Sequence, residues 1–238
     1  MIKDYISFDL ETTGFEADND FIIEIGALKV RNGKVCERFI ELLKPPIPIP
    51  SRITEITGIT DEMVQSSKDT KKVIHAFLEF CEDYMLVGHN ILFDYKFIKT
   101  YAVEYGYTFE KKGIDTLQIA RKTHRDLKSK SLSSLCEHYD IKNGAAHRAY
   151  HDALATAKVY HMLAHDFEEE YPDLFVPKTL QYKPPKVQPC TQKQVEYLKL
   201  LCDYHKIPIE ENVEQLTRSE MSKMIDGIIS TRGKMRSE

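Results

Sequence analysis

The sequence lacks long apolar stretches, although it contains 238 residues. No run approaches the roughly 18 residues that a membrane-spanning helix requires, and the N-terminal residues MIKDYISFDLET include acids where a signal peptide would be apolar. Several enzyme motifs are also missing, namely the GxxxxGKS/T phosphate loop, the GxGxxG dinucleotide turn, HExxH and GxSxG. We therefore expect a soluble, unexported protein without P-loop, Rossmann or serine-hydrolase chemistry.

Cysteine is sparse and unpaired in pattern. The five cysteines are odd in number and widely spaced, and no CxxC pair suggests a zinc or redox centre. They are typical of reduced thiols in an intracellular protein, and we expect a cytoplasmic location. With 42% hydrophobic and 29% charged residues, the composition is globular rather than disordered or fibrous.

The sequence also lacks a basic excess. Its 33 Lys and Arg residues against 37 Asp and Glu residues give a net charge of −4, which argues against a broad basic surface for nucleic acid. The charge is uneven, because residues 1–175 carry 22 basic and 29 acidic residues and the rest carries a basic excess. One segment is rich in basic residues, namely Arg121, Lys122, Arg125, Lys128 and Lys130. A solvated turn and a local site for nucleic-acid phosphates are equal alternatives for this segment.

Hydrophobic patterning predicts an α/β protein. Apolar and β-branched residues predict three strands at the start, and Asn32-Gly33 predicts a type I′ turn between the second and the third. The proline cluster at 45–50 is expected to be a connector. Helical spacing and one short apolar run predict alternating helices and a strand after it. The expected strands are 5–9, 21–30, 35–43 and 85–87, and the expected helices lie near 73–84, 97–105, 115–121, 132–139 and 149–167.

Prolines divide the chain near its C-terminal end. Prolines between 172 and 189 interrupt any periodic element and predict a linker. Beyond it, Thr191 can cap one helix, and Thr217 with Glu220 forms a capping-box pattern that opens a second. The expected organisation is a large first domain over 1–170, a linker over 171–190 and a small helical module over 191–238.

Asp9 and Glu11 stand two positions apart at the end of the first strand, so both side chains point to the same face. Two adjacent acids repel one another unless a cation lies between them. Solvated acids after the end of a strand are the simpler alternative. The turn residues Thr12, Thr13 and Gly14 follow at once, and hard cations such as Mg²⁺ or Mn²⁺ prefer carboxylate and phosphate oxygens.

Phe15 projects from the same turn, where an aromatic ring could stack on a terminal base, although a core position is the commoner fate of phenylalanine. Asp94 lies near the start of a helix, where the helix dipole alone favours an acid. His147 and Asp152 would point about 140° apart on one helix, so they converge only if His147 lies in the preceding loop. His151 is the competing histidine, but it adjoins Asp152 and points to another side.

Four segments together resemble the DEDDh 3′–5′ exonucleases, relatives of the proofreading epsilon subunit of bacterial DNA polymerase III. The segments are FDLETTGF at 8–15, ITGITDEM at 56–63, HNILFD at 89–94 and the H-x4-D pair at 147–152. Their order and spacing agree over residues 4–168. The resemblance implies a ribonuclease-H-like fold, with a mixed central sheet flanked by helices, and the small C-terminal module beside it.

The resemblance also implies the site. Asp9, Glu11, Asp94 and Asp152 would hold two divalent cations, Mg²⁺ or Mn²⁺, and His147 would be the general base. The 3′-terminal nucleotide would be contacted by Thr12, Thr13, Gly14 and Phe15, together with His89 and Asn90. Several relatives carry a histidine where this sequence has Thr57, which receives only a weak substrate role.

The implied activity is metal-dependent release of nucleoside 5′-monophosphates from single-stranded DNA 3′ ends, in proofreading or repair. A ribonuclease acting on RNA ends or short oligoribonucleotides is one alternative, because the resemblance does not fix the sugar. A non-catalytic polymerase accessory subunit is another. The C-terminal module could contact a DNA polymerase or another protein, or add a nucleic-acid contact through Lys193, Lys199 and Lys206. We expect no membrane partner.

Overall fold

The computed structural model describes residues 1–144, 146–184, 188–209 and 213–235. The chain divides into two compact units. The first comprises Met1–Lys44 and Pro50–Pro184, and the second comprises Pro45–Ile49 and the described residues after Pro184. Ala145 and parts of the expected linker and helical module lie outside the described residues. None of the helices in the described part of the chain is both long and apolar enough to cross a membrane.

The first three strands form the predicted hairpin-containing start of the sheet. They are β1 (Tyr5–Thr12), β2 (Ile22–Arg31) and β3 (Lys34–Leu42), with β2 antiparallel to both neighbours. Asn32 and Gly33 both have positive φ, as the predicted type I′ turn requires. Strand β1 continues to Thr12, so Asp9 and Glu11 lie within a paired strand and not beyond its end.

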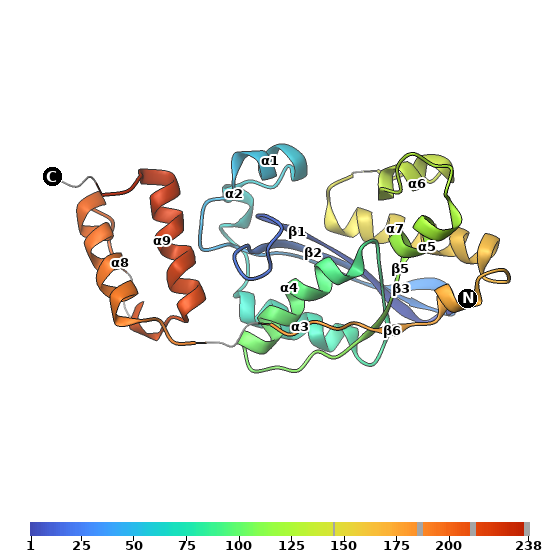
Figure 1. Ribbon diagram of the computed structural model, residues 1–238, viewed down its shortest axis with the longest axis horizontal. Coiled ribbons are helices and arrows are strands. Elements are labelled where there is room, and N and C mark those ends of the chain that lie inside the picture. The colour runs from blue at the N-terminus through green and yellow to red at the C-terminus, as the bar shows by residue number, and fades with distance from the viewer. Residues whose placement is uncertain (145, 185–187, 210–212, 236–238) are drawn as a thin grey trace. The chain divides into compact units, whose positions relative to one another are not determined.

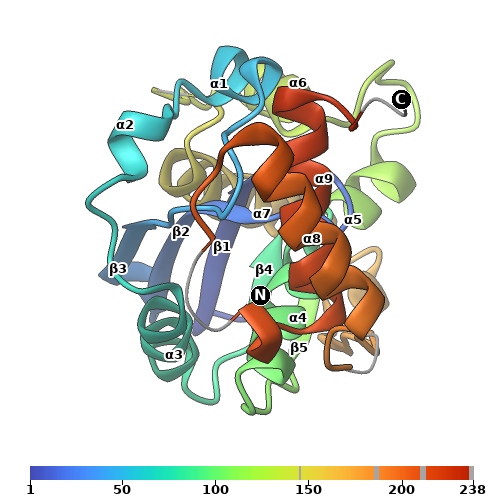
Figure 2. The ribbon, with the colours of Figure 1, turned by 90° about the vertical axis from the view of Figure 1, so that its left-hand side faces the viewer.

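The sheet is mixed and has the order β3-β2-β1-β4-β5-β6. Strands β4 (Leu86–Gly88) and β5 (Lys112–Asp115) run parallel to β1, and β6 (Lys178–Thr179) is antiparallel to β5. Figure 2 shows β3, β2 and β1 side by side. The α/β class and the expected ribonuclease-H-like arrangement of a mixed sheet between helices are confirmed.

Helices cover both faces of this sheet (Figure 1). One face packs against α3 (Thr70–Cys81) and α4 (Ile91–Glu104), and the other against α5 (Thr116–Thr123), α6 (Leu132–His138) and α7 (Ala149–Phe167). The two short helices α1 (Ser51–Thr57) and α2 (Asp61–Val64) follow the proline cluster and were not predicted.

The alternation along β1 decides which side chains meet α7. Ile6, Phe8 and Leu10 enter the core beneath α3 and α4. Tyr5 points the other way into the core beneath α7, and the Ser7 hydroxyl donates a hydrogen bond to the Ala153 carbonyl of α7. Because side chains alternate with period two, Asp9 and Glu11 share this second face.

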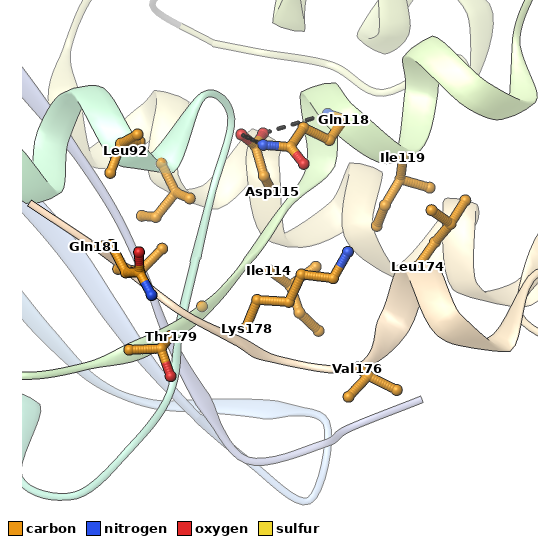
Figure 3. A pocket seen from close by; sticks show the side chains of 13 residues that line it. Leu92, Ile114, Asp115, Gln118, Ile119, Leu174, Val176, Lys178, Thr179 and Gln181 are labelled. Carbon is orange, nitrogen blue, oxygen red and sulfur yellow. Dashed lines mark hydrogen bonds between the residues drawn. The ribbon is translucent and has the colours of Figure 1, made fainter.

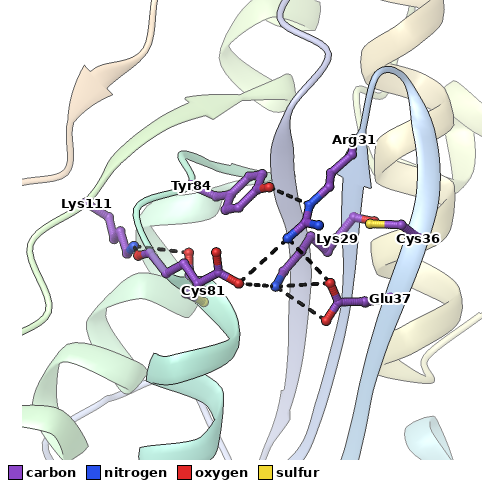
Figure 4. A network of polar contacts seen from close by, with 8 residues as sticks. Lys29, Arg31, Cys36, Glu37, Cys81, Tyr84 and Lys111 are labelled. Atoms are coloured by element: carbon purple, nitrogen blue, oxygen red, sulfur yellow. Dashed lines mark hydrogen bonds and ion pairs between the residues drawn. The ribbon is translucent and has the colours of Figure 1, made fainter.

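A buried lysine of β2 forms an ion pair with Glu82, which directly follows α3. The Lys29 side chain is 2% exposed, and its Nζ lies 2.7 Å from Glu82 and 3.4 Å from Glu37 (Figure 4). It also lies over the Phe80 ring, with Nζ 4.8 Å from the centroid. A buried ammonium requires such partners, because removing its charge from water is costly.

The expected linker over 171–190 is wrong in its first part. Residues up to Pro184 belong to the first unit, and they contain a 3₁₀ turn (Pro172–Phe175) and strand β6. Phe175 is buried beneath α7, and Leu180 is buried beside α3 and α4. The prolines prevent a helix here, but they leave room for an edge strand of two residues.

The second unit contains the predicted pair of helices. They are α8 (Gln192–His205) and α9 (Arg218–Arg232), with a 3₁₀ turn (Val213–Gln215) before α9. Both begin with a capping box, formed by Thr191 with Gln194 and by Thr217 with Glu220. Their small core includes Val195, Leu198, Leu201, Cys202, Met221 and Ile225.

Candidate active site

Three carboxylates converge between β1 and α7. Asp9 and Glu11 come from the face of β1 that α7 covers, and Asp152 lies in the first turn of α7. One oxygen from each carboxylate lies within 4.8 Å of the others. Burial, followed by the nearby acids, raises the pKa of Asp9 well above its usual range and that of Glu11 to about 8. Such a group of hard oxygen donors fits divalent cations, whose charge removes the repulsion.

Asp94 lies against the same part of β1. It stands in the first turn of α4 and is only 3% exposed. Its Oδ1 accepts a hydrogen bond from the Leu10 N–H at 3.0 Å, between the two acids of β1. Burial raises its pKa well above the usual range, although backbone hydrogen bonds oppose this. Asp94 is therefore adjacent to the group of three carboxylates without belonging to it.

His147 lies in the loop before α7, as convergence with Asp152 requires. Its φ is +63°, in the left-handed region, and its side chain is exposed. Its backbone N–H donates a hydrogen bond to Asp152 Oδ2 at 2.8 Å. The competing His151 lies inside α7, half-buried, with its ring 5.8 Å from that of Tyr150. The structure thus brings the backbone of His147 to the acid group.

Sequence reasoning missed Asn143. Its Nδ2 donates a hydrogen bond to Asp152 Oδ1 at 2.7 Å, so each oxygen of Asp152 accepts one N–H. The signal available in the sequence is the pair Asn143-Gly144, which is typical of a turn or loop. Asn143 and the His147 N–H together fix the orientation of the Asp152 carboxylate.

The turn after β1 presents Phe15 to solvent. Thr13 Oγ1 accepts a hydrogen bond from the Phe21 N–H at 2.9 Å and bonds to Asp20 at 3.2 Å. A Cβ on Gly14 would lie 2.4 Å from the Asp20 carboxylate, so glycine allows the close approach. Phe15 is 82% exposed, which rules out the core alternative. The Thr12 hydroxyl bonds to the Gly14 carbonyl at 2.6 Å.

The profile of the exonuclease family matches residues 6–160, which include all four acids and His147. The chain belongs to this exonuclease family. It is 41% identical to the PolC-type DNA polymerase III of Caldanaerobacter subterraneus over 166 residues, which cover 70% of this chain and 12% of the polymerase. It is 36% identical to the DNA polymerase III subunit epsilon of Aquifex aeolicus over 157 residues, which cover 66% of this chain and 78% of that subunit. The chain therefore spans about one eighth of the PolC-type relative.

Among solved structures, the exonuclease unit is similar to Escherichia coli exonuclease I in complex with a dT13 oligonucleotide. The TM-score is 0.63 at 18% identity, and the match covers 73% of this chain and 43% of exonuclease I. At this identity the likeness concerns the fold. It agrees with the mixed sheet and flanking helices described above.

The other residues predicted for the site have partners within the chain. His89 Nδ1 lies 2.9 Å from the Thr116 hydroxyl, and burial lowers the pKa of His89. The Asn90 N–H donates to Asp115 at 2.9 Å. The Thr57 hydroxyl donates to the Ile53 carbonyl and accepts the Ile59 N–H. These contacts stabilise β4, α4 and α1 locally, and the substrate roles of His89, Asn90 and Thr57 stay predictions.

A cavity of about 290 Å³ lies beside the start of α4, between β5, α5 and β6. Figure 3 shows apolar side chains in its wall, with the polar groups of Gln118 and Lys178 near them. Asp115, the last residue of β5, lines this cavity, and its carboxylate also accepts a hydrogen bond from the Asn90 N–H. The acids of the exonuclease motif do not line it. Its labelled lining residues include Leu92, Ile114, Ile119, Leu174 and Val176.

The basic segment lies on α5 and the loop that follows it. Arg121, Lys122, Arg125 and Lys128 are exposed, and Lys130 is half-buried with its Nζ bonded to the Leu127 carbonyl. The chain thus offers positive charge after α5, and its use as a phosphate track stays a prediction.

Proposed function

We propose that the chain is a two-metal-ion 3′–5′ exonuclease that releases nucleoside 5′-monophosphates from single-stranded DNA. The observation that carries this proposal is the convergence of Asp9, Glu11 and Asp152, with Asp94 adjacent and the His147 loop bonded to Asp152. A chain that used this fold only for binding would have no need of four gathered carboxylates, whose mutual repulsion and, for Asp94 and Asp152, burial are costly.

The four acids would hold Mg²⁺ or Mn²⁺, and the identity of the ions is part of the proposal. Two such ions, when bound, neutralise charge on the attacking and leaving oxygens of an in-line displacement. The exposed imidazole of His147 would take the proton from the attacking water. Asp152, fixed by two N–H donors, holds its orientation during this step. The 3′ oxygen leaves, so the product carries the phosphate at its 5′ position.

The terminal nucleotide would stack on Phe15. Its ring is 82% exposed and lies 6.4 Å from that of Phe93, which belongs to α4 one residue before Asp94. Stacking tolerates any base, since every base has a π face. This aromatic pair therefore supports a site that degrades a strand without regard to its sequence.

Single-stranded DNA is the proposed substrate for two reasons. The relatives with the highest similarity named above are DNA polymerase III proteins, and exonuclease I shares the fold and was solved with a dT13 oligonucleotide. Proofreading would require a polymerase partner in trans, or on the same chain beyond these residues. The sugar preference is the part of the proposal that the assay below decides.

The deciding experiment uses matched 5′-labelled DNA and RNA single strands with Mg²⁺ or Mn²⁺. A ladder on DNA that disappears in the Asp152→Ala variant and in excess EDTA is the expected result. A ladder on RNA alone would show that the substrate is RNA and not DNA. Full activity of Asp152→Ala would overturn the mechanism. Absence of any ladder from a cation-loaded wild type would favour an accessory subunit.

We further propose that the C-terminal module contacts a protein, with a DNA polymerase as the first candidate. Leu200 and Tyr204 lie one turn apart on α8 and are 60% and 48% exposed. Two lysines of the expected basic strip instead form ion pairs, Lys199 with Glu214 at 2.9 Å and Lys206 with Asp203 at 3.3 Å. Titration calorimetry with the purified polymerase subunit should show binding that Leu200→Asp abolishes, and retained binding would overturn this assignment.

A further inference from the structure

Arg148 stands at the corner between the His147 loop and helix α7. Its Nη2 lies 2.7 Å from Oε1 of Glu24 and its Nε lies 3.1 Å from Oε2, so the pair is bidentate. Glu24 Oε2 also accepts the Ala149 N–H at 2.9 Å. Because the N-cap residue Arg148 offers no capping side chain, the carboxylate of a neighbouring strand caps α7. The corner is therefore attached to β2 through Glu24.

Glu24 itself lies beside the acid group. It is the direct partner of Glu11 in the β1–β2 ladder, and its side chain is 1% exposed. Like charges at directly opposite positions destabilise a sheet. Without Arg148, Glu24 would be a buried carboxylate without a countercharge, directly opposite Glu11. The Arg148 guanidinium supplies the countercharge of this carboxylate and also interacts electrostatically with Glu11.

Helix α7 contacts β2 close to Glu24, at Gly26. A Cβ on Gly26 would lie 2.0 Å from the Tyr150 nitrogen, so backbone meets backbone there. Gly26 is also the register partner of Asp9. The first turn of α7, which contains Asp152, thus rests directly on the strand next to Asp9. Any shift of the Arg148 corner would change the separation of Asp152 from Asp9.

We propose that Arg148 is a positioning residue of the exonuclease site. Its bidentate pair with Glu24 fixes the corner that carries His147 and Asp152. The activity part of this inference rests on the proposed function, but the cation-binding part does not. Arg148 acts through Glu24, and its side chain, 37% exposed, does not need to touch the substrate.

The test uses the full chain and Mn²⁺ as the probe, with binding followed by the electron paramagnetic resonance signal of free Mn²⁺. Arg148→Gln should weaken Mn²⁺ binding and lower kcat by about 10- to 100-fold each, the range found when groups that orient a metal site are removed, because the corner that carries Asp152 is no longer held to β2. KM for single-stranded DNA should stay within about threefold. Arg148→Lys should be intermediate, since an ammonium cannot form the fork. Arg38→Gln is the matched control, because Arg38 lies over the Tyr150 ring of α7 at 5.4 Å.

The double variant Arg148→Gln with Glu24→Gln separates positioning from simple loss of packing. Removing the second charge should restore Mn²⁺ binding toward the wild-type value, which a purely structural role would not do. A raised KM with unchanged Mn²⁺ binding would assign Arg148 to the substrate and overturn the inference, as would equal behaviour of Arg148→Gln and Arg38→Gln. If Arg148→Gln does not fold, unchanged Mn²⁺ binding in both Arg148→Lys and Glu24→Gln overturns it.

Failure of the proposed function has a different signature. A wild type that binds Mn²⁺ but degrades neither DNA nor RNA would refute the exonuclease proposal alone. The comparison of Mn²⁺ affinities among the variants would still decide the role of Arg148. Melting temperatures in EDTA, measured for each variant, separate loss of fold from loss of cation binding.

Discussion

The backbone N–H of His147 donates a hydrogen bond to the carboxylate of Asp152 at 2.8 Å, across the start of helix α7. The predicted base and a predicted cation ligand are thus joined by the main chain. His147 has a left-handed φ of +63°, and its side chain is exposed to solvent while its N–H is bonded to Asp152. A change that loosens Asp152 should therefore disturb the His147 loop as well.

Asn143→Ala should lower kcat by about 10-fold or more, because outer partners of metal ligands contribute this much. The substitution removes the 2.7 Å bond to Asp152 Oδ1 and leaves the His147 N–H as the remaining donor among the contacts described. Steady-state kinetics on labelled single-stranded DNA measures the effect. Lys142→Ala, at the exposed neighbouring position, serves as the control and should retain wild-type kcat.

In EDTA, stability should fall as the pH rises from about 4.5 toward 8. Burial and nearby acids raise the pKa of Glu11 to about 8 from an ordinary value of 4.5. The folded chain therefore retains a proton that the unfolded chain has already lost, and this stabilisation disappears as the pH passes through the folded-state pKa. Asp9 and Asp94 act in the same direction. Thermal unfolding at several pH values measures the slope.

Mg²⁺ should reverse that trend, since a bound cation favours the ionised carboxylates. The rise in melting temperature on adding Mg²⁺ should be larger at pH 8 than at pH 6. Glu11→Gln should reduce the slope in EDTA. A slope that is the same with and without Glu11 would contradict the predicted linkage.

Gly26→Ala should destabilise the chain by about 1–3 kcal/mol, the usual cost of overpacking. The added methyl group would lie 2.0 Å from the Tyr150 nitrogen and 2.2 Å from the Ala149 carbonyl carbon. Helix α7 must then move away from β2, and cation binding should weaken with it. Urea unfolding and Mn²⁺ titration measure the two effects. Gly144→Ala meets nothing within 4 Å and should leave stability unchanged.

Phe15→Ala should impair binding of the 3′ nucleotide without affecting the fold. A side chain that is 82% exposed contributes little to stability, so the change in unfolding free energy should stay within about 0.5 kcal/mol. Loss of a stacking partner costs about 1–3 kcal/mol per base, which appears as a raised KM. Ile40→Ala, at another exposed apolar position, is the control. An unchanged KM would remove Phe15 from the substrate site.

Local patterns predicted the long elements well. The positive φ values of Asn32 and Gly33 belong to the turn itself, so two residues sufficed to predict the hairpin. Apolar spacing placed α7 at its observed bounds, since nineteen residues repeat the helical period several times. Strands β5 and β6, of four and two residues, carry no period, and they form because β4 and then β5 offer an open edge. The prolines before Pro184 therefore suggested a linker where the chain continues the sheet.

The sequence by itself determined which acids belong to the motif and which side of each element they occupy. The period of two put Asp9 and Glu11 on one face, and the geometry of a helix required His147 to precede it. Only the tertiary structure decided what holds them. Glu24 and Arg148 are 124 residues apart and meet only because α7 packs backbone to backbone on Gly26. Periodicity states which side chains share a face, whereas packing decides which faces meet.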